Sequence, residues 1–274
     1  MAEPGVLRFS SLVVRVMGLS PGAGKLSGTN TYLGAGGRRR ILVDVGEGRA
    51  GYVPALLVAM RDHGCDDLSD AVLTHFHHDH IGGLADLRQH FAGLKAWKFM
   101  PRMLKGPVEA ETAGFLSVAA DPRAALLRLL GLGAGADPGE LHELFDGSTL
   151  STDDGLATLR VLATPGHTAD HMRLPRLVEK PSIFSGDSVL GGSTAVFAEL
   201  PTYLNSLHRL RAECAEGTMR IYPAPPISRE TQILAHIQQG SAIIWGITRA
   251  LYHGKVDWRL LPAAAHNLSL SRVS

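Results

Sequence analysis

The chain is 274 residues long, which is enough to bury a large core in one domain, or in one domain with an appendage. Hydrophobic residues make up 45% of it and charged residues 19%, a composition that excludes a disordered protein. The formal net charge is +1, so bulk charge does not indicate a nucleic-acid binder. The arginine run at residues 38–40 predicts either a local basic patch or an ordinary solvated turn.

The features that bear on cellular location favour an intracellular protein. No apolar run approaches the roughly 18 residues needed to cross a bilayer, so no membrane partner is expected. Residues 1–18 lack the basic, apolar and small-residue layout of a secretory signal. The two cysteines, Cys65 and Cys214, stand alone in the sequence, which fits ordinary buried thiols in a reducing compartment. We therefore expect the cytoplasm or the mitochondrial matrix.

Short runs rich in β-forming residues alternate with turns in the first hundred residues. Strands bounded by glycine or polar residues are expected at 12–17, 29–33, 40–44, 70–74 and 95–99. Helical spacing of apolar residues predicts a helix at 51–63, with Pro54 tolerated in its first turn, and another at 81–91. A meander of strands followed by strand–helix units predicts an α/β fold in which helices cover the sheets.

The rest of the chain divides into a helical middle, a second set of strands and a helical end. The Ala-, Leu- and Gly-rich segment 101–145 predicts a helical insertion with one amphipathic helix at 122–132. Strands are expected at 158–163, 182–185 and 219–222, and helices at 201–214, 231–251 and within 260–274. We expect one main domain over residues 1–228 and a short C-terminal helical segment over residues 229–274.

Four histidines and an aspartate crowd into the stretch THFHHDHIGG, residues 74–83, directly after an apolar run. His75 and His77 can both face one site if the backbone beyond the strand is extended or turning. Asp79 and His80 then begin the next helix, which returns them to the same space. Zinc takes three or four nitrogen and oxygen ligands at about 2.0–2.2 Å, and neutral imidazole with carboxylate is a suitable mixture. The stretch therefore predicts a metal site at the end of a strand.

Three further stretches place candidate residues at strand ends. TPGHTADH supplies His167 in a tight Pro–Gly turn, and FSGDSVL supplies Asp187 after a glycine. A carboxylate such as Asp187 can bridge two metal ions, which a histidine does not readily do. LVDVGEG supplies Asp44, which we expect to orient the metal-binding loop as a hydrogen-bond acceptor.

The order H-x-H-x-D-H, G-H-T and S-G-D, with D-x-G upstream, resembles the metallo-β-lactamase superfamily over roughly residues 10–230. The stretches SGTNTYL, RRILVDVGEG, TPGHTADHM and IFSGDSVLGGSTAVF are similar in particular to the lactamase-β-like protein 2 group. That group includes mitochondrial endoribonucleases that cut single-stranded RNA. Related fungal thioesterases, which release polyketides from carrier proteins, share much of the pattern. The resemblance implies an αββα sandwich with a metal site at one edge of its two sheets.

The resemblance also implies two zinc ions. His75, His77 and His167 would hold the first, and Asp79, His80 and Asp187 the second, with Asp187 as the bridge. A hydroxide between the ions would be the nucleophile, because bound zinc lowers the pKa of water to about 7. Asp79 is expected to be a catalytic residue as well as a ligand.

Two departures from the family pattern affect these expectations. The family's last metal ligand, a histidine in Y-P-x-H-G-P, has no counterpart in IYPAPPISRE, residues 221–230. Three outcomes are open. In the first, the second ion keeps three protein ligands, the number usual for a catalytic zinc. In the second, His171 substitutes for the missing histidine, and in the third, one weakly bound ion leaves the protein inactive. Pro175 interrupts what is a regular strand in the family, which predicts that this strand is an edge strand or is bulged.

Two classes of function are therefore considered. One is a zinc-dependent hydrolase of single-stranded RNA or, alternatively, of acyl carrier protein thioesters. The other is a catalytically impaired homologue that binds metal or RNA. Arg and Lys side chains near the groove would favour RNA, and a deep apolar channel would favour an acyl chain. No specificity for DNA is indicated.

Overall fold

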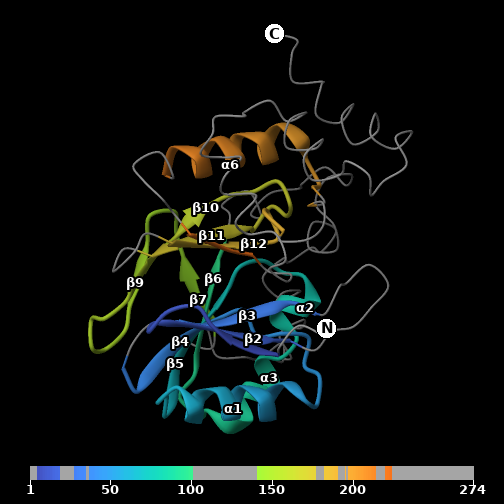
Figure 1. Cartoon of the computed structure of the whole chain (residues 1–274). Coiled ribbons are helices and arrows are strands. Elements are labelled where there is room, and N and C mark those ends of the chain that lie inside the picture. Colours follow the sequence, from blue (N-terminus) through green and yellow to red (C-terminus); the bar gives the residue numbers. More distant parts are fainter. Residues whose placement is uncertain are drawn as a thin grey trace, which may run out of the picture.

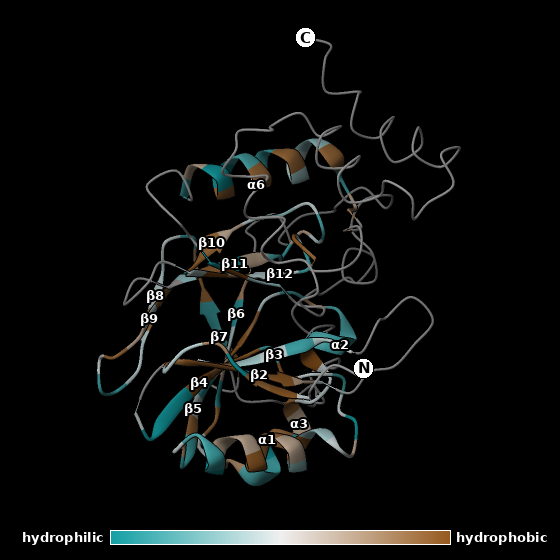
Figure 2. Cartoon of the chain, viewed as in Figure 1, coloured by the Kyte–Doolittle hydropathy of each residue, from teal (hydrophilic) through white to brown (hydrophobic). Residues whose placement is uncertain are grey.

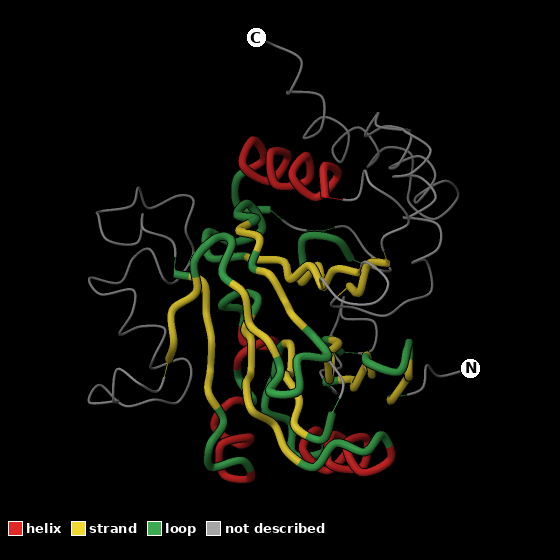
Figure 3. The backbone as a smooth tube through the Cα atoms, turned by 90° about the vertical axis from the view of Figure 1, so that its left-hand side faces the viewer, coloured by secondary structure: helices red, strands yellow, loops and turns green. Residues whose placement is uncertain are grey.

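The computed structural model describes residues 5–18, 28–34, 37–100, 141–176, 182–190, 195, 197–213 and 220–223. Two β-sheets lie face to face, with α1 (Tyr52–Asp62) and α3 (Leu84–His90) outside the first sheet and α6 (Leu200–Glu213) outside the second (Figure 1). A view turned by 90° shows the same layers, with helices at both ends and strands between them (Figure 3). The predicted αββα sandwich is confirmed.

The first sheet has seven strands in chain order. They are β1 (Val6–Arg8), β2 (Val13–Met17), β3 (Asn30–Gly34), β4 (Arg39–Val43), β5 (Asp67–Leu73), β6 (Lys95–Phe99) and β7 (Leu141–Leu144). The first four form an antiparallel meander, and β4 to β7 pair in parallel. Because parallel strands point the same way, the carboxyl ends of β4 to β7 lie at one edge of the sheet.

The second sheet runs in the order β13-β12-β11-β9-β8, with β10 also paired to β11. Its strands are β8 (Thr149–Ser151), β9 (Thr158–Arg160), β10 (Leu162–Ala163), β11 (Met172–Arg176), β12 (Ser182–Gly186) and β13 (Arg220–Pro223). The pair β12–β13 is parallel and the other pairs are antiparallel. The ends of β12 and β13 therefore lie together, with Gly186 opposite Pro223.

Buried apolar side chains form a core on each face of the first sheet. One cluster packs α1 and α3 against the sheet through residues such as Leu33, Leu56 and Leu84. The other fills the space between the sheets, where the ring of Tyr32 lies 5.1 Å from that of Phe184. Figure 2 shows hydrophobic segments on strands of both sheets and on the helices that cover them. Each fully buried side chain of this kind contributes about 1.5–3 kcal/mol, so the two cores together hold the layers.

Most predicted elements are present, with boundaries moved by a few residues. The predicted strand 95–99 is β6, the predicted helix 51–63 is α1, and the predicted helix 201–214 is α6. Residues 158–163 form two short strands that separate at Val161. Residues 81–91 belong to two helices, α2 (His78–Ile81) and α3, which separate at Gly82 and Gly83.

The prediction of a helical insertion is wrong for its last residues. Leu141–Leu144 form β7, which extends the first sheet by pairing in parallel with β6. Pairing with a neighbouring strand outweighs the helical spacing of the sequence LHEL. The strands β1 and β8 were not predicted. The remainder of the insertion, and the helices predicted after residue 223, lie outside the described residues.

The strand with Pro175 was predicted to be an edge strand or to be bulged, and the edge placement is wrong. β11 lies between β12 on one side and β9 with β10 on the other. Pro175 pairs with Ile183 of β12. On the opposite side the partner strand is interrupted at Val161, between β10 and β9. A proline, which has no N–H to donate, is thus placed beside an interruption in the ladder within the sheet.

The arginine run forms ordinary local contacts. Arg38 pairs with Asp66, Arg39 pairs with Asp67, and Arg40 donates to the backbone oxygen of His63. Arg39 and Arg40 begin β4 and Arg40 is buried, so only Arg38 fits the predicted solvated turn.

Cys65 agrees with the expectation of an ordinary buried thiol. Burial raises the pKa of the Cys65 thiol to about 11, as expected for a thiol within the core. In the part of the chain that the structure describes, no helix is long and apolar enough to cross a bilayer.

Candidate metal centre

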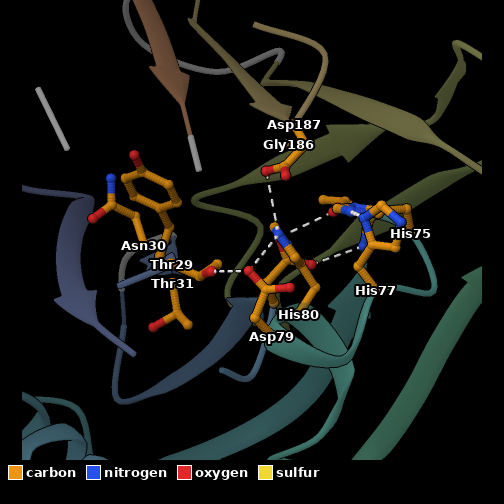
Figure 4. Close-up of polar contacts among 12 residues, drawn as sticks. Thr29, Asn30, Thr31, His75, His77, Asp79, His80, Gly186 and Asp187 are labelled. Carbon is orange, nitrogen blue, oxygen red and sulfur yellow. Dashed lines mark hydrogen bonds and ion pairs between the residues drawn. The ribbon is translucent and has the colours of Figure 1, made fainter. Parts of the chain in front are cut away.

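The candidate residues meet at the edge where the parallel strands of the first sheet end. Beyond Leu73, the last residue of β5, the chain passes through His75 and His77 into α2. His167 lies in the turn between β10 and β11, and Asp187 directly follows β12. Figure 4 shows Asp187 pointing from the second sheet towards the residues of the histidine-rich stretch. Both sheets therefore contribute to one site.

Three imidazole nitrogens form a nearly equilateral triangle. His77 Nδ1 lies 3.0 Å from His75 Nε2 and 3.1 Å from His167 Nε2, and the latter two are 3.3 Å apart. Nitrogen ligands arranged tetrahedrally at about 2.0–2.1 Å from zinc are separated by roughly 3.3 Å. Each ring nitrogen carries either a proton or a lone pair, so three mutual contacts cannot all be hydrogen bonds. The triangle fits one metal ion as the common partner of the three rings.

A carboxylate completes this group. The ligand atoms of His75, His77, His167 and Asp187 all lie within 4.8 Å of one another. Burial lowers the pKa of His75 well below its ordinary value and also lowers the pKa of His77, and neighbouring histidines lower both further. Both rings are therefore neutral at physiological pH, which is the form that binds a metal. Three nitrogens and one oxygen make a donor set that suits zinc.

Thr74 and Asp44 fix the ring of His75. Asp44 accepts hydrogen bonds from Thr74 N at 2.8 Å and from Thr74 Oγ1 at 3.0 Å. The hydroxyl proton of Thr74 points at Asp44, so Thr74 Oγ1 accepts a hydrogen bond from His75 Nδ1 at 3.0 Å. The lone pair of His75 Nε2 is then left for the triangle. Asp44 thus lies where an acceptor was predicted, with a φ of 58° that is strained for a residue other than glycine.

A second group of candidate ligands lies beside the first. His80 Nδ1 is 2.8 Å from Asp44 Oδ2, which leaves His80 Nε2 facing Asp187 Oδ1 at 3.2 Å. Asp79 Oδ2 lies 3.8 Å from His80 Nε2 and accepts a 2.5 Å hydrogen bond from Thr29 Oγ1 (Figure 4). The three residues expected to hold a second ion are therefore adjacent, and Asp187 contacts both groups.

His80 and Asp187 carry opposite charges when no ion lies between them. Burial alone would lower the pKa of His80, but the carboxylates of Asp44 and Asp187 outweigh it and raise the pKa well above its ordinary value. Burial alone would raise the pKa of Asp187, but the charge and hydrogen bond of His80 lower it. This attraction accounts for the 3.2 Å approach of His80 Nε2 to Asp187 Oδ1.

His171 lies next to the site but outside the group of four. Its side chain is buried, with Nδ1 3.0 Å from Thr164 Oγ1 and its ring centroid 5.4 Å from that of His75. A Cβ at Gly186 would lie 2.7 Å from His171 Nε2, and the φ of Gly186 is +50°. Glycine before Asp187 is thus required by the close approach of this histidine.

The strand that precedes the missing histidine ends at the same edge. Pro223, the last residue of β13, accepts hydrogen bonds from Asn30 Nδ2 at 3.0 Å and from Tyr32 Oη at 2.6 Å. Both donors belong to β3, so the first sheet holds the end of this strand of the second sheet. Ala224 and Pro225 lie outside the described residues.

Sequence reasoning missed the residues that orient the candidate ligands through other contacts. Thr74 and Asp170 lie within the sequence motifs of the site. Their closeness in sequence to a candidate ligand could therefore have identified them. Thr29 contacts Asp79 across 50 residues, and Lys98 contacts Asp170 across 72 residues. No local pattern gives contacts of that kind.

A sequence profile of the metallo-beta-lactamase superfamily matches residues 24–223. The match covers the strands from β3 to β13 and every residue of the two candidate groups. The chain belongs to the metallo-beta-lactamase superfamily.

Three similar proteins with curated names are two thioesterases and one beta-lactamase-like protein 2 homolog. Thioesterase pkgB of Emericella nidulans is 32% identical over 83% of this chain and 59% of that protein. An atrochrysone carboxyl ACP thioesterase of Aspergillus chevalieri is 34% identical over 74% of this chain and 54% of that protein. The beta-lactamase-like protein 2 homolog of Drosophila melanogaster is 34% identical over 76% of this chain and 62% of that protein. The chain spans less than two thirds of the length of each of these relatives.

Solved structures share the fold at low sequence identity. A beta-lactamase domain protein from Burkholderia ambifaria has a TM-score of 0.61 and 18% identity, covering 97% of this chain and 85% of that one. AidC, a dizinc quorum-quenching lactonase, has a TM-score of 0.52 and 18% identity, covering 72% of each chain. These likenesses concern the fold.

Proposed function

We propose that the chain is a metal-dependent hydrolase whose ion is held by His75, His77, His167 and Asp187. The observation that carries this proposal is the triangle of imidazole nitrogens with a carboxylate beside it. Zinc is the proposed ion because its usual ligands are imidazole nitrogen and carboxylate oxygen. When bound, it would polarise the bond to be cleaved and supply a water of lowered pKa.

A second metal-binding position, of lower affinity, is proposed beside the first. Asp79, held by Thr29, and His80, held by Asp44, face the same space as Asp187. A second ion there would share Asp187 with the first and would otherwise have only Asp79 and His80, against three imidazoles at the first position. We therefore propose that the two ions bind with unequal affinity. Asp79 is the proposed catalytic residue, because its carboxylate borders this position and remains partly exposed.

Single-stranded RNA is the first substrate class that we propose. The support is the likeness of the stretches around the metal motifs to the lactamase-β-like protein 2 group, together with the similarity to the Drosophila homolog of that name. An RNA substrate is consistent with the expected location in the mitochondrial matrix or the cytoplasm.

Thioesters of acyl carrier proteins are the second candidate. Two similar proteins carry the name thioesterase, one of them for an ACP-bound substrate. A thioester carbonyl and a phosphodiester both present an oxygen that a metal ion can polarise, so the same site serves either reaction.

The test is a side-by-side assay of the zinc-loaded chain on one labelled single-stranded RNA and one acyl carrier protein thioester, with His75→Ala as the control. Cleavage of the RNA that disappears in the control supports the first proposal. Cleavage of the thioester alone transfers the proposal to the second candidate. A chain that binds zinc but cleaves neither substrate would overturn the hydrolase assignment and leave a metal-binding homologue.

A further inference from the structure

A buried lysine lies at the end of β6, next to the turn that carries His167. Lys98 is 0% exposed and Asp170 is 2% exposed. Lys98 Nζ lies 2.7 Å from Asp170 Oδ2 and donates a hydrogen bond of 2.9 Å to the backbone oxygen of Asp170. One ammonium group thus contacts both the side chain and the main chain of a residue in the opposite sheet's turn.

The contact reaches His167 through one further hydrogen bond. Asp170 Oδ1 accepts from Thr168 Oγ1 at 2.6 Å, and Thr168 directly follows His167. The backbone oxygen of Thr168 accepts from Gly166 N at 3.1 Å. Both neighbours of His167 therefore belong to one hydrogen-bonded turn that Lys98 joins to β6.

The two ends of this turn have other attachments. Ser206 Oγ donates to the backbone oxygen of Pro165 at 2.6 Å, which ties the beginning of the turn to α6. Met172 N donates to the backbone oxygen of Thr74 at 3.0 Å, which ties its end to the residue after β5. Between these ends, Gly166 O accepts hydrogen bonds from Ala198 N at 2.7 Å and from Glu199 N at 3.3 Å, which holds the residue before His167. Lys98 holds the part of the turn after His167, through Asp170.

A charged pair at this place needs an explanation other than stability. Burial lowers the pKa of Lys98, and the carboxylate of Asp170 opposes that effect. A buried ion pair is often no more stabilising than an apolar pair of similar volume. An apolar pair, however, cannot donate a directed hydrogen bond to a backbone oxygen. What the charged pair adds is a fixed position for the turn.

We propose that Lys98 and Asp170 are positioning residues that raise the metal affinity of the site by holding His167 in place. The proposal rests on the proposed function of the nitrogen triangle as a metal site. Groups that orient a metal ligand through an intervening contact typically change affinity by about 10–100-fold when they are removed. The pair would act across the two sheets, since Lys98 belongs to one and His167 to the other.

The experiment measures zinc affinity by competition with a chelator in the natural chain and in the double variant Lys98→Met with Asp170→Asn. Both charges are removed together, because either charge left alone would be buried without its partner. We expect zinc to bind about 10–100-fold more weakly in the double variant.

Two comparisons separate positioning from a general loss of stability. Leu56→Ala creates a cavity beneath α1, far from the turn, and should lower the melting temperature without changing zinc affinity. In a His167→Ala background, the double variant should cause no further loss of affinity, because the ligand that the pair positions is gone. The visible absorption spectrum of the cobalt-substituted double variant should shift towards that of His167→Ala.

The outcomes are distinguishable. If the natural chain binds no zinc, the proposed metal site fails before this inference is reached. If the natural chain binds zinc and the double variant binds it equally well, the positioning role is wrong while the site stands. A loss of affinity that persists undiminished in the His167→Ala background would also overturn the positioning role.

Discussion

At the scale of single residues, neighbouring histidines of one motif have different surroundings. His77 is partly buried, has an extended backbone with φ −61° and ψ 139°, and joins the nitrogen triangle. His78 begins α2 and is exposed. The change from extended to helical backbone between the two residues turns their side chains in different directions. Three of the four histidines in the stretch are therefore candidate ligands, and His78 is not.

His75→Ala and His77→Ala should each abolish tight zinc binding and hydrolysis. Each change removes one corner of the triangle, and direct ligands matter more than the indirect contacts whose loss costs about 10–100-fold in affinity. Elemental analysis after dialysis measures the retained metal. His78→Ala is the matched control, since it removes an imidazole from the same motif and should keep full zinc content. Undiminished zinc in either triangle variant would refute the assignment.

Asp187→Asn should keep the fold and lose the shared carboxylate. Asp187 Oδ1 faces His80 and Oδ2 lies 3.7 Å from His167 Nε2, so one side chain serves both groups. A neutral amide is a poorer ligand for a cation, so the second ion should leave first, while the triangle retains an ion more weakly. Zinc titration followed by calorimetry resolves the two steps. Unchanged occupancy of both positions would rule out a bridging role.

At the scale of elements, the end of β13 is positioned for a ligand that the sequence lacks. Asn30 and Tyr32 of β3 both hold the backbone oxygen of Pro223. Insertion of His-Gly between Ala224 and Pro225 would recreate the family pattern Y-P-A-H-G-P. We expect the insertion to raise zinc affinity at the second position by at least about 10–100-fold, and RNA turnover to rise with it.

The control for this variant is insertion of Ala-Gly at the same place. It lengthens the chain equally but offers no imidazole, so its zinc affinity and turnover should match those of the natural chain. Equal occupancy and equal rates in the His-Gly variant would mean that the natural protein already fills the second position by another route. His171 would then be the first residue to substitute.

The elements that could be predicted are those whose signals are local. The strand 95–99 was found with its boundaries because Gly93 and the following Pro101 delimit a run of β-forming residues. β7 was missed because its four residues carry no alternation and are a strand only through pairing with β6. The place of β11 was misjudged for a similar reason. Pro175 has no N–H to donate, which indicates that a hydrogen bond between strands is missing at this position. The sequence does not tell whether the side of the strand without that bond faces solvent or an interrupted neighbouring strand.

The sequence predicted which side chains meet in the candidate site. His75, His77, His167 and Asp187 follow strand ends in motifs with fixed spacing, and the structure brings all four together. The orientation of those ligands could not be predicted. The donors and acceptors that set it, such as Thr29 for Asp79 and Lys98 for Asp170, are distant in sequence and meet only after the two sheets pack.

At the scale of the whole molecule, the site joins the two sheets. His75 and His77 follow β5 of the first sheet, whereas His167 and Asp187 follow strands of the second. An ion bound to all four would therefore connect the layers, and it would bind the folded chain in preference to the unfolded one.

Removal of the ion should for this reason lower the thermal stability of the natural chain. Zinc at a free concentration 100 times its dissociation constant would stabilise the fold by about 2.7 kcal/mol. For a chain of this size, that corresponds to a melting temperature roughly 5–10 °C higher than with a chelator present. Differential scanning fluorimetry with and without chelator measures the difference. In His77→Ala the two curves should coincide, and a chelator effect that survives there would point to a different site.

The most direct test of the metal centre is anomalous diffraction from zinc-soaked crystals of the natural chain, recorded on both sides of the zinc absorption edge. The account predicts one strong peak about 2.0–2.2 Å from His75 Nε2, His77 Nδ1, His167 Nε2 and a carboxylate oxygen of Asp187. It also predicts a weaker peak, or none, between Asp79 and His80. A strong peak away from the nitrogen triangle, or no peak within it at saturating zinc, would contradict the account.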